Sequence, residues 1–263
     1  MHELDKTRRR KLGLSRVDIR LFTEGHPPTL AKILDFAGDT PVSIVNAIGG
    51  GMGGQSQLEA EESNVLVPNL VLARLLAMNL SVHWVQISSI LVSDRVRLSM
   101  RAPETVYTKQ KAAAEKTVMA KMHEVGGKLT ILRLGSLFGK SQGKSKAANL
   151  ILANPRHASS VLSNKFLESS RDYVYDAEAA EFIVSLATDA TYDGVNPHRV
   201  TFGTGTKISG YELIAMVTAK SEGKVLPNPS LEYLQDLSSE EQLQFVTAQT
   251  RLIDFYKLTE GKH

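Results

Sequence analysis

Apolar residues along this chain fall into two alternating patterns. Short runs rich in Val, Ile, Leu and Phe predict β-strands, at residues 17–22, 42–46, 82–88, 129–133 and 199–202. Longer stretches in which apolar residues recur every three or four positions predict helices, at residues 28–36, 64–78, 106–122, 176–186 and 209–219. Regular alternation of strands with helices is typical of a parallel sheet built from strand–helix–strand units. We therefore predict an α/β fold whose doubly wound parallel sheet carries helices on both faces.

The pattern changes in the second half of the chain. Residues 140–170 are rich in Ser, Asn and Lys with weak periodicity, and the tail after Gly223 contains an acidic, polar stretch predicted to be helical near 238–249. We expect a sheet domain at 1–140 and, at 141–263, mainly a smaller lobe, with 172–205 returning to the sheet. Because ligands of open α/β sheets bind at the carboxyl ends of the strands, this small C-terminal lobe would enclose a substrate cleft.

Composition narrows the kinds of site that the chain can hold. The 263 residues include no cysteine, which excludes disulfides, thiolate metal sites and cysteine nucleophiles. The seven histidines show no ligand spacing, so we expect no metal site. The polar, basic start and the lack of any long apolar run lead us to expect no signal peptide, no membrane span and a cytoplasmic location.

Much of the formal net charge of +3 comes from one basic run near the start, which comprises Lys6, Arg8, Arg9, Arg10 and Lys11. This run could contact a phosphate, for instance the 2′-phosphate of a cofactor, or it could be a solvated terminus. Aromatic residues are not interleaved with the basic ones and no recognition motif follows, so we expect no nucleic-acid binding.

A pair of ionisable residues lies near the start of a predicted helix. Tyr107 and Lys111 are four residues apart and share one helical face, where an ammonium group would lower the pKa of a phenol. Such pairs also occur by chance on exposed helices, so the context of this one matters. The strand at 82–88 runs into the hydroxyl of Ser89, and the turn at 134–139 follows the next strand. We expect these three elements to meet at the carboxyl edge of the sheet.

Five stretches, taken in their order along the chain, resemble the extended short-chain dehydrogenases of the NAD-dependent epimerase/dehydratase family. The family's Ser-Ser strand end matches residues 87–89, and its Tyr-x-x-Ser-Lys-x-x-x-Glu helix matches residues 107–115, with Gln110 in place of serine. The other stretches are NVLVPN at 64–69, RDYVYD at 171–176 and GTG at 203–205. The ordered set spans about residues 17–219 and is more specific than any single motif. The resemblance implies a Rossmann-like cofactor domain at 1–140, followed by the substrate lobe.

The resemblance also implies a Ser-Tyr-Lys site. Tyr107 would be the acid or base on a carbonyl or hydroxyl, Lys111 would hold the nicotinamide ribose and tune the tyrosine, and Ser89 would hydrogen-bond the reacting oxygen. The implied cofactor is NAD or NADP. The residues implied to bind it are Asp5, Asn46, Ala47, Gly49, Tyr107, Lys111 and Leu134.

The implied substrate is nucleotide-sugar-like, with Ser136 and Arg171 binding it. The planar guanidinium of Arg171 suits substrate phosphates, and an ion pair with a neighbouring carboxylate is the alternative. Dehydratases of the family place Asp and Glu directly after the strand-end hydroxyl, whereas Ser89 is followed by Ile90 and Leu91. We therefore expect an NAD(P)-dependent epimerase or ketoreductase. The alternative is a non-catalytic, cofactor-free binding or scaffold protein that retains the fold.

The chain departs from the family pattern at its start. The strand, Gly-x-x-Gly-x-x-Gly turn and helix that cradle the cofactor pyrophosphate are not found before Val17, so we expect an N-terminally incomplete cofactor domain. On that alignment Asp5 falls where a carboxylate grips the adenosine ribose. The run GGGMGG at 49–54 has the spacing G-x-G-x-x-G, but the downstream motifs favour a flexible loop there. A start further upstream, a rearrangement or partner, or loss of dinucleotide binding would each account for the gap.

Two further expectations concern partners and rival folds. The predicted helices at 64–78 and 106–122 resemble those through which the family dimerises, so we expect a homodimer. No Gly-x-Ser-x-Gly elbow is found, which argues against an α/β-hydrolase.

Overall fold

The computed structural model describes residues 42–47, 61–77, 82–139, 146–188, 198–222 and 232–249. The strand and helix predicted at 17–22 and 28–36, the basic run and the glycine run at 49–54 lie outside these residues. Within the described ranges, no helix is both long enough and apolar enough to cross a membrane.

A sheet of five parallel strands forms the centre of the described structure. In spatial order the strands are β1 (Val42–Asn46), β2 (Val82–Ser89), β3 (Lys128–Leu134), β7 (His198–Gly203) and β9 (Phe245–Thr247). Every neighbouring pair is parallel, so each connection must cross over the sheet. The parallel sheet predicted from the sequence is confirmed.

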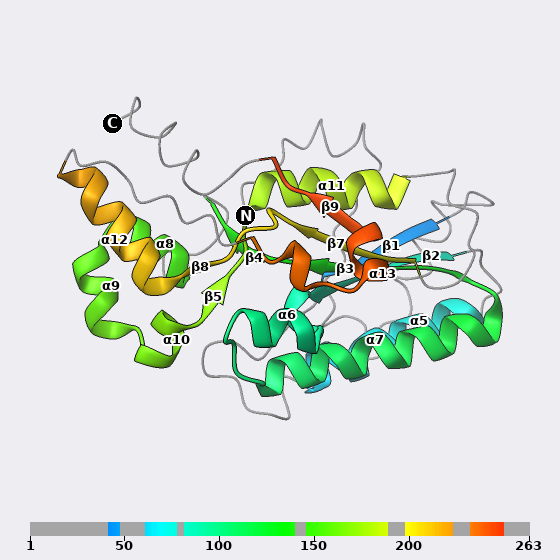
Figure 1. Cartoon of the computed structure of the whole chain (residues 1–263). Helices are drawn as coiled ribbons and strands as arrows, with labels where there is room; N and C mark the ends of the chain where they lie inside the picture. Colours follow the sequence, from blue (N-terminus) through cyan, green and yellow to red (C-terminus); the bar gives the residue numbers. More distant parts are fainter. Residues whose placement is uncertain are drawn as a thin grey trace, which may run out of the picture.

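Helices cover both faces of this sheet (Figure 1). One face carries α7 (Val106–Val125) and α5 (Val67–Ala77), which continues a π-helical turn at Glu62–Leu66, and the opposite face carries α11 (Asp176–Thr188). Successive residues of β3 point to opposite faces, as a strand requires. Ile131 packs in the core beneath α5 and α7, whereas Leu132 packs in the core beneath α11. The doubly wound arrangement is therefore confirmed.

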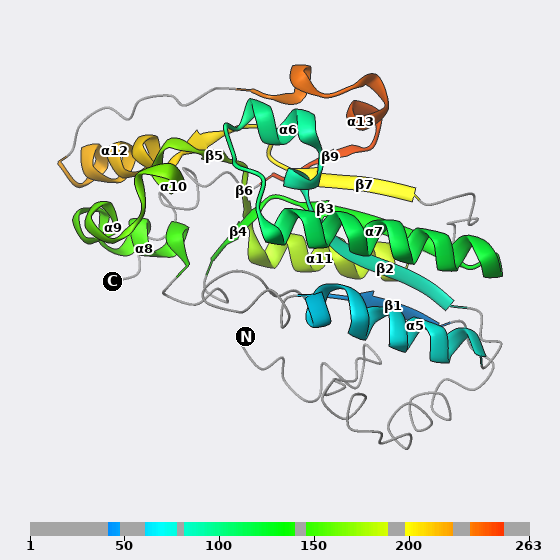
Figure 2. The same cartoon turned by 90° about the horizontal axis from the view of Figure 1, so that it is seen from below.

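A smaller group of elements lies at one end of the sheet (Figures 1 and 2). Its helices are α8 (Ala147–Ala153), α9 (Pro155–Val161), α10 (Asn164–Glu168) and α12 (Gly210–Ser221). Two small sheets join it to the rest: β4 (Ser136–Phe138) pairs with β6 (Tyr173–Tyr175), and β5 (Ser170–Arg171) pairs with β8 (Ile208–Ser209). The weak periodicity at 140–170 thus corresponds to three short helices, which bury Ile151 and Ala158 against α12.

The predicted helix at 238–249 is wrong over its second half. Helix α13 (Ser239–Leu243) is short, and the chain then enters β9, which pairs with β7. The edge of β7 provides backbone partners for this segment: the Thr201 N–H donates to the Gln244 carbonyl at 2.9 Å and the Ala248 N–H donates to the Gly203 carbonyl. An edge strand with unpaired backbone groups can outweigh a local helical pattern, because buried peptide groups need partners.

Candidate active site

The carboxyl end of β2 lies against the first turns of α7. Two β2 residues approach α7 residues that are spaced by four: the Ser89 side chain is close enough to Tyr107 to lower the pKa of its phenol, and the Ile87 carbonyl accepts from Lys111 Nζ at 3.2 Å. The Lys111 ammonium also lies 5.9 Å from the centre of the Tyr107 ring. The structure therefore brings the predicted trio of Ser89, Tyr107 and Lys111 together at the edge of the sheet.

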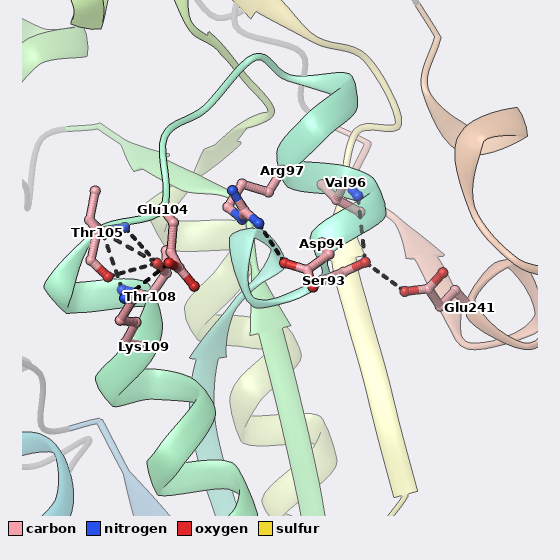
Figure 3. Close-up of polar contacts among 9 residues, drawn as sticks. All are labelled: Ser93, Asp94, Val96, Arg97, Glu104, Thr105, Thr108, Lys109 and Glu241. Carbon is pink, nitrogen blue, oxygen red and sulfur yellow. Dashed lines mark hydrogen bonds and ion pairs between the residues drawn. The ribbon is translucent and has the colours of Figure 1, made fainter.

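A capping box starts α7 just before the tyrosine (Figure 3). The Thr108 N–H donates to Thr105 Oγ1 at 3.2 Å, and the Thr105 N–H donates to Thr108 Oγ1 at 3.0 Å. Two backbone donors that a helix start leaves unpaired are thereby satisfied. An exposed ion pair between Lys109 and Glu104, 3.0 Å long, lies beside the cap. The cap fixes Tyr107 in the first turn, where its hydroxyl reaches the end of β2.

Burial dominates the electrostatics of the trio. Burial raises the pKa of Tyr107, and the hydrogen bond from Ser89 partly opposes this. Burial lowers the pKa of Lys111 to about 8, and the negative charge of Glu115 opposes that shift. The sequence predicted that the ammonium would lower the pKa of the phenol; instead the pKa is raised, because loss of water around the ring is the largest effect and Ser89 provides the opposing one. Tyr107 is thus a neutral hydroxyl near pH 7, and a fraction of Lys111 is neutral in mildly alkaline solution.

The remaining predicted cofactor residues lie at strand ends or outside the described ranges. Asn46, the last residue of β1, is buried and donates to Gln86 Oε1 at 2.9 Å, and Ala47 after it is exposed. Leu134 ends β3 and lies beside Ser89 in the register of the two strands. Asp5 and Gly49 are outside the described residues.

The two predicted substrate residues lie where the sheet meets the smaller group of helices. Ser136 opens β4, and its N–H donates to the Asp172 carbonyl at 2.7 Å. The Arg171 guanidinium lies over the ring of Phe166, 4.7 Å from its centre, and no carboxylate of the described residues forms an ion pair with it. Burial lowers the pKa of Arg171. The structure does not place either residue in contact with the Ser-Tyr-Lys trio.

Asp172 has a structural role that the sequence analysis missed. Its carboxylate is fully buried and accepts four hydrogen bonds: from the Thr204 N–H and hydroxyl at 2.9 and 2.7 Å, from the Gly205 N–H at 3.0 Å and from the Tyr233 hydroxyl at 2.8 Å. A Cβ at Gly203 would lie 2.4 Å from Asp172 Oδ2, so only glycine allows this approach. The GTG stretch is therefore a turn closed around a buried carboxylate.

A second missed feature is the buried ion pair beneath Lys111. Arg133 on β3 donates through Nε and Nη2 to the Glu115 carboxylate at 3.0 and 2.8 Å. The family motif included Glu115 without assigning it a role, and nothing in the sequence pairs it with an arginine 18 residues away. A charged residue inside an apolar strand was the available signal, because a buried guanidinium needs a partner.

Comparisons with known proteins bear on the origin of this arrangement. A UDP-glucuronic acid 4-epimerase from Bacillus cereus, solved with UDP-glucuronic acid and NAD, is 15% identical with a TM-score of 0.63, and the match covers 95% of this chain and 83% of that one. A dTDP-glucose 4,6-dehydratase from Bacillus anthracis, solved with NAD, is 15% identical with a TM-score of 0.56, covering 90% and 72%. A UDP-N-acetylglucosamine 4-epimerase from Bacillus cereus is 17% identical with a TM-score of 0.60, covering 88% and 82%. At these identities the likeness shows the fold.

Sequence comparison gives the family. No curated protein sequence matches the chain significantly. The model of the NAD dependent epimerase/dehydratase family matches residues 8–200, which is most of the chain and includes β1, β2, α7 and the Arg171 stretch. Residues 8–200 therefore carry the family's pattern across both the sheet and the segment that leads into the smaller group of helices. The chain belongs to the NAD dependent epimerase/dehydratase family.

Proposed function

We propose that this chain is an NAD(P)-dependent epimerase or ketoreductase that acts on a nucleotide-sugar-like substrate through Ser89, Tyr107 and Lys111. One observation carries the proposal: the buried ammonium of Lys111 lies 5.9 Å from the centre of the Tyr107 ring, and the Ser89 side chain is close enough to the Tyr107 hydroxyl to lower its pKa. Two hydroxyls and an ammonium at the carboxyl edge of a parallel sheet form a donor set suited to a reacting oxygen and a sugar ring.

The chemistry of these side chains fits the nicotinamide end of a dinucleotide. The Lys111 ammonium would hold the ribose hydroxyls, and Asn46 and Leu134 at neighbouring strand ends would line the same edge. When bound, NAD(P) supplies or accepts a hydride. The structures of the dehydratase and of the 4-epimerase named above contain NAD, which supports this class of cofactor.

In the proposed mechanism Tyr107 transfers the proton. Its phenol is neutral near pH 7, and burial, which raises its pKa, favours this form further, so it can donate a proton to a carbonyl oxygen and recover it from a hydroxyl. Ser89 would hydrogen-bond the same oxygen and steady the charge that develops on it. Lys111, charged below pH about 8, would favour the phenolate whenever Tyr107 gives up its proton.

The residues after Ser89 support epimerisation or reduction over dehydration. Ser89 caps the short 3₁₀ helix Ile90–Val92, accepting from the Leu91 N–H at 3.3 Å, and Ile90 is buried in an apolar cluster. No carboxylate follows the hydroxyl there to supply the acid and base of water elimination.

Arg171 is proposed to bind the substrate phosphates, as a planar guanidinium suits two phosphate oxygens at once. The 4-epimerase complex with UDP-glucuronic acid supports this substrate class.

The test is the substitution Tyr107→Phe. Removing one hydroxyl should lower NAD(P)-dependent turnover of UDP-sugars on the order of 10²–10⁴-fold, because general acid–base catalysis is worth that much. Tyr211→Phe is the matched control, since that exposed hydroxyl contacts only Asn164 among the described residues. Thermal unfolding with NAD(H) and NADP(H) checks cofactor binding, where about 100 times Kd should add roughly 2.7 kcal/mol. Unchanged turnover in Tyr107→Phe would refute the catalytic assignment.

The same thermal experiment decides between the enzyme and the cofactor-free scaffold. A scaffold should show no shift with either nucleotide and no effect of Tyr107→Phe.

We also propose a homodimer formed through α5 and α7. Leu66 at the end of the π-helical turn and Leu70 in α5, four residues apart, are 53% and 61% exposed, as an apolar contact surface would require. A monomeric mass by light scattering at micromolar concentration would contradict the dimer.

A further inference from the structure

Glu115 is buried and is held by several hydrogen bonds. Its side chain is 5% exposed, and both carboxylate oxygens have partners. Oε1 accepts from the Ser88 hydroxyl at 2.5 Å and from Arg133 Nε at 3.0 Å, and Oε2 accepts from Arg133 Nη2 at 2.8 Å. The two anchoring residues are neighbours across β2 and β3, where Ser88 pairs with Arg133. The carboxylate is therefore fixed to two strands at once.

Three consecutive residues at the end of β2 contact one face of α7. Residues 87, 88 and 89 contact Lys111, Glu115 and Tyr107 respectively. These helix residues are spaced by four and stack on one face, so a shift of α7 along β2 would break all three contacts together. Of the three contacts, that of Glu115 is the one reinforced by a bidentate arginine, which is the strongest of the usual side-chain pairings.

Charge gives Glu115 a second effect. Lys111 is 3% exposed, and burial disfavours its ammonium form, while the charge of Glu115 favours it. Tyr107 and Glu115 act on Lys111 from its own helix, and on β2 the Ile87 carbonyl accepts from Lys111 Nζ. Arg133 comes from β3 and pairs with Glu115. Burial raises the pKa of Glu241 on α13, but hydrogen bonds from Ser238 and Ser93, and to a smaller extent the charge of Arg133, lower it overall. Among the causes of the Lys111 shift, Glu115 is the one that acts to keep the ammonium charged.

We propose that Glu115 is a positioning residue of the site: clamped by Arg133 and Ser88, it fixes α7 against the end of β2 and supplies the negative charge that the buried Lys111 ammonium needs. Its effect on turnover rests on the proposed function, whereas its effect on Lys111 does not. Glu115 touches no reacting atom and acts through Lys111 and Tyr107. Without it, Lys111 would lose its charge at a lower pH, and the Tyr107 hydroxyl would lose its fixed place beside Ser89.

The experiment is to measure the titration of Lys111 by NMR in protein labelled with ¹³C at lysine Cε. The Lys111 signal is assigned as the one that is lost in Lys111→Arg. Glu115→Gln keeps the shape and removes the charge, so the Lys111 titration should move to lower pH on the order of one unit. A purely structural role predicts the opposite sign, because a loosened helix would hydrate Lys111 and raise its pKa. Glu104→Gln is the matched control, and its exposed partner Lys109 reports on the same helix.

A second variant covers the case in which Glu115→Gln leaves Arg133 uncompensated and does not fold. E115M/R133M replaces the buried pair with apolar side chains of similar volume, which proteins often tolerate. Because this variant also removes the charge of Glu115, the Lys111 titration should again move to lower pH. In both variants the alkaline limb of the kcat/KM profile should move with the NMR titration, and Glu104→Gln should leave both unchanged.

The outcomes separate the two proposals. A downward shift in the Lys111 titration supports this inference even if no protein shows turnover, a result that would refute the proposed function alone. An unchanged or upward shift in the variants overturns the inference, whether or not the wild type is an active enzyme.

Discussion

The buried carboxylate of Asp172 offers a sharp test of what holds the two parts of the structure together. It lies between β5 and β6, and its four donors come from the turn after β7 and from Tyr233 in the C-terminal segment. Asp172→Asn changes one oxygen into an NH₂ group and alters the shape very little. Whichever oxygen is replaced, the new donor faces a backbone N–H, that of Thr204 or that of Gly205, which cannot turn away.

The magnitude follows from that geometry. One buried backbone N–H loses its acceptor, at a cost of about 1–3 kcal/mol. The remaining hydrogen bonds lose their ionic partner and weaken. Burial raises the pKa of Asp172, so the neutral amide avoids part of the cost of burying a charge, which offsets some of the loss. We expect Asp172→Asn to lower the free energy of unfolding by about 2 kcal/mol.

The assay is urea unfolding followed by the fluorescence of Trp84, the single tryptophan, which is buried in the core beneath α5 and α7. Far-UV circular dichroism, recorded in parallel, checks that one transition is observed. Tyr233→Phe, which removes one of the four donors, should cost about 1 kcal/mol. In the double variant the two effects should not add, because both residues share the 2.8 Å hydrogen bond. A loss below about 0.5 kcal/mol for Asp172→Asn would refute the argument.

Three further predictions concern the core, the helix start and pH. Ile131→Ala should lower the free energy of unfolding by about 2–5 kcal/mol in the same urea assay, because Ile131 is fully buried and removal of its side-chain carbons leaves a cavity. A smaller change would mean that the core collapses into the cavity. Thr105→Ala removes half of the capping box and should cost about 1 kcal/mol, with lower turnover since Tyr107 lies in that turn. Burial lowers the pKa of Lys111 from 10.5 to about 8, so the folded chain binds this proton less well than the unfolded chain. The free energy of unfolding of the wild type should therefore rise relative to that of Lys111→Met between pH about 8 and 10, and parallel curves would contradict the shift.

Much of the fold follows from periodicity alone. The β1 strand coincides with its prediction, and α7 and α11 begin at the predicted residues. These elements were predictable because the residues that define them repeat at the spacing of a strand or a helix and face one core. The segment that became β9 was not predictable in this way. Its three residues, Phe245, Val246 and Thr247, favour a strand, but so short a run directly follows a helical pattern, and its conformation depends on the edge of β7, which is distant in the sequence.

The candidate site divides in a similar manner. The trio of Ser89, Tyr107 and Lys111 could be proposed from the sequence because a helix places residues four apart on one face and a strand ends at Ser89. The pKa direction of Tyr107 could not, since it depends on how much water α7 loses when it packs on β2.

What the sequence by itself determined is the set of parallel elements and the side chains that reach the carboxyl edge of the sheet. What only the tertiary structure decided is which group partners each buried charge. Arg133 meets Glu115, and Asp172 meets the turn at 204–205, because distant strands and helices bring them within hydrogen-bonding distance. The physical reason is that periodicity reports which face of an element avoids water, whereas the partner of a buried charge is set by the packing of elements against one another.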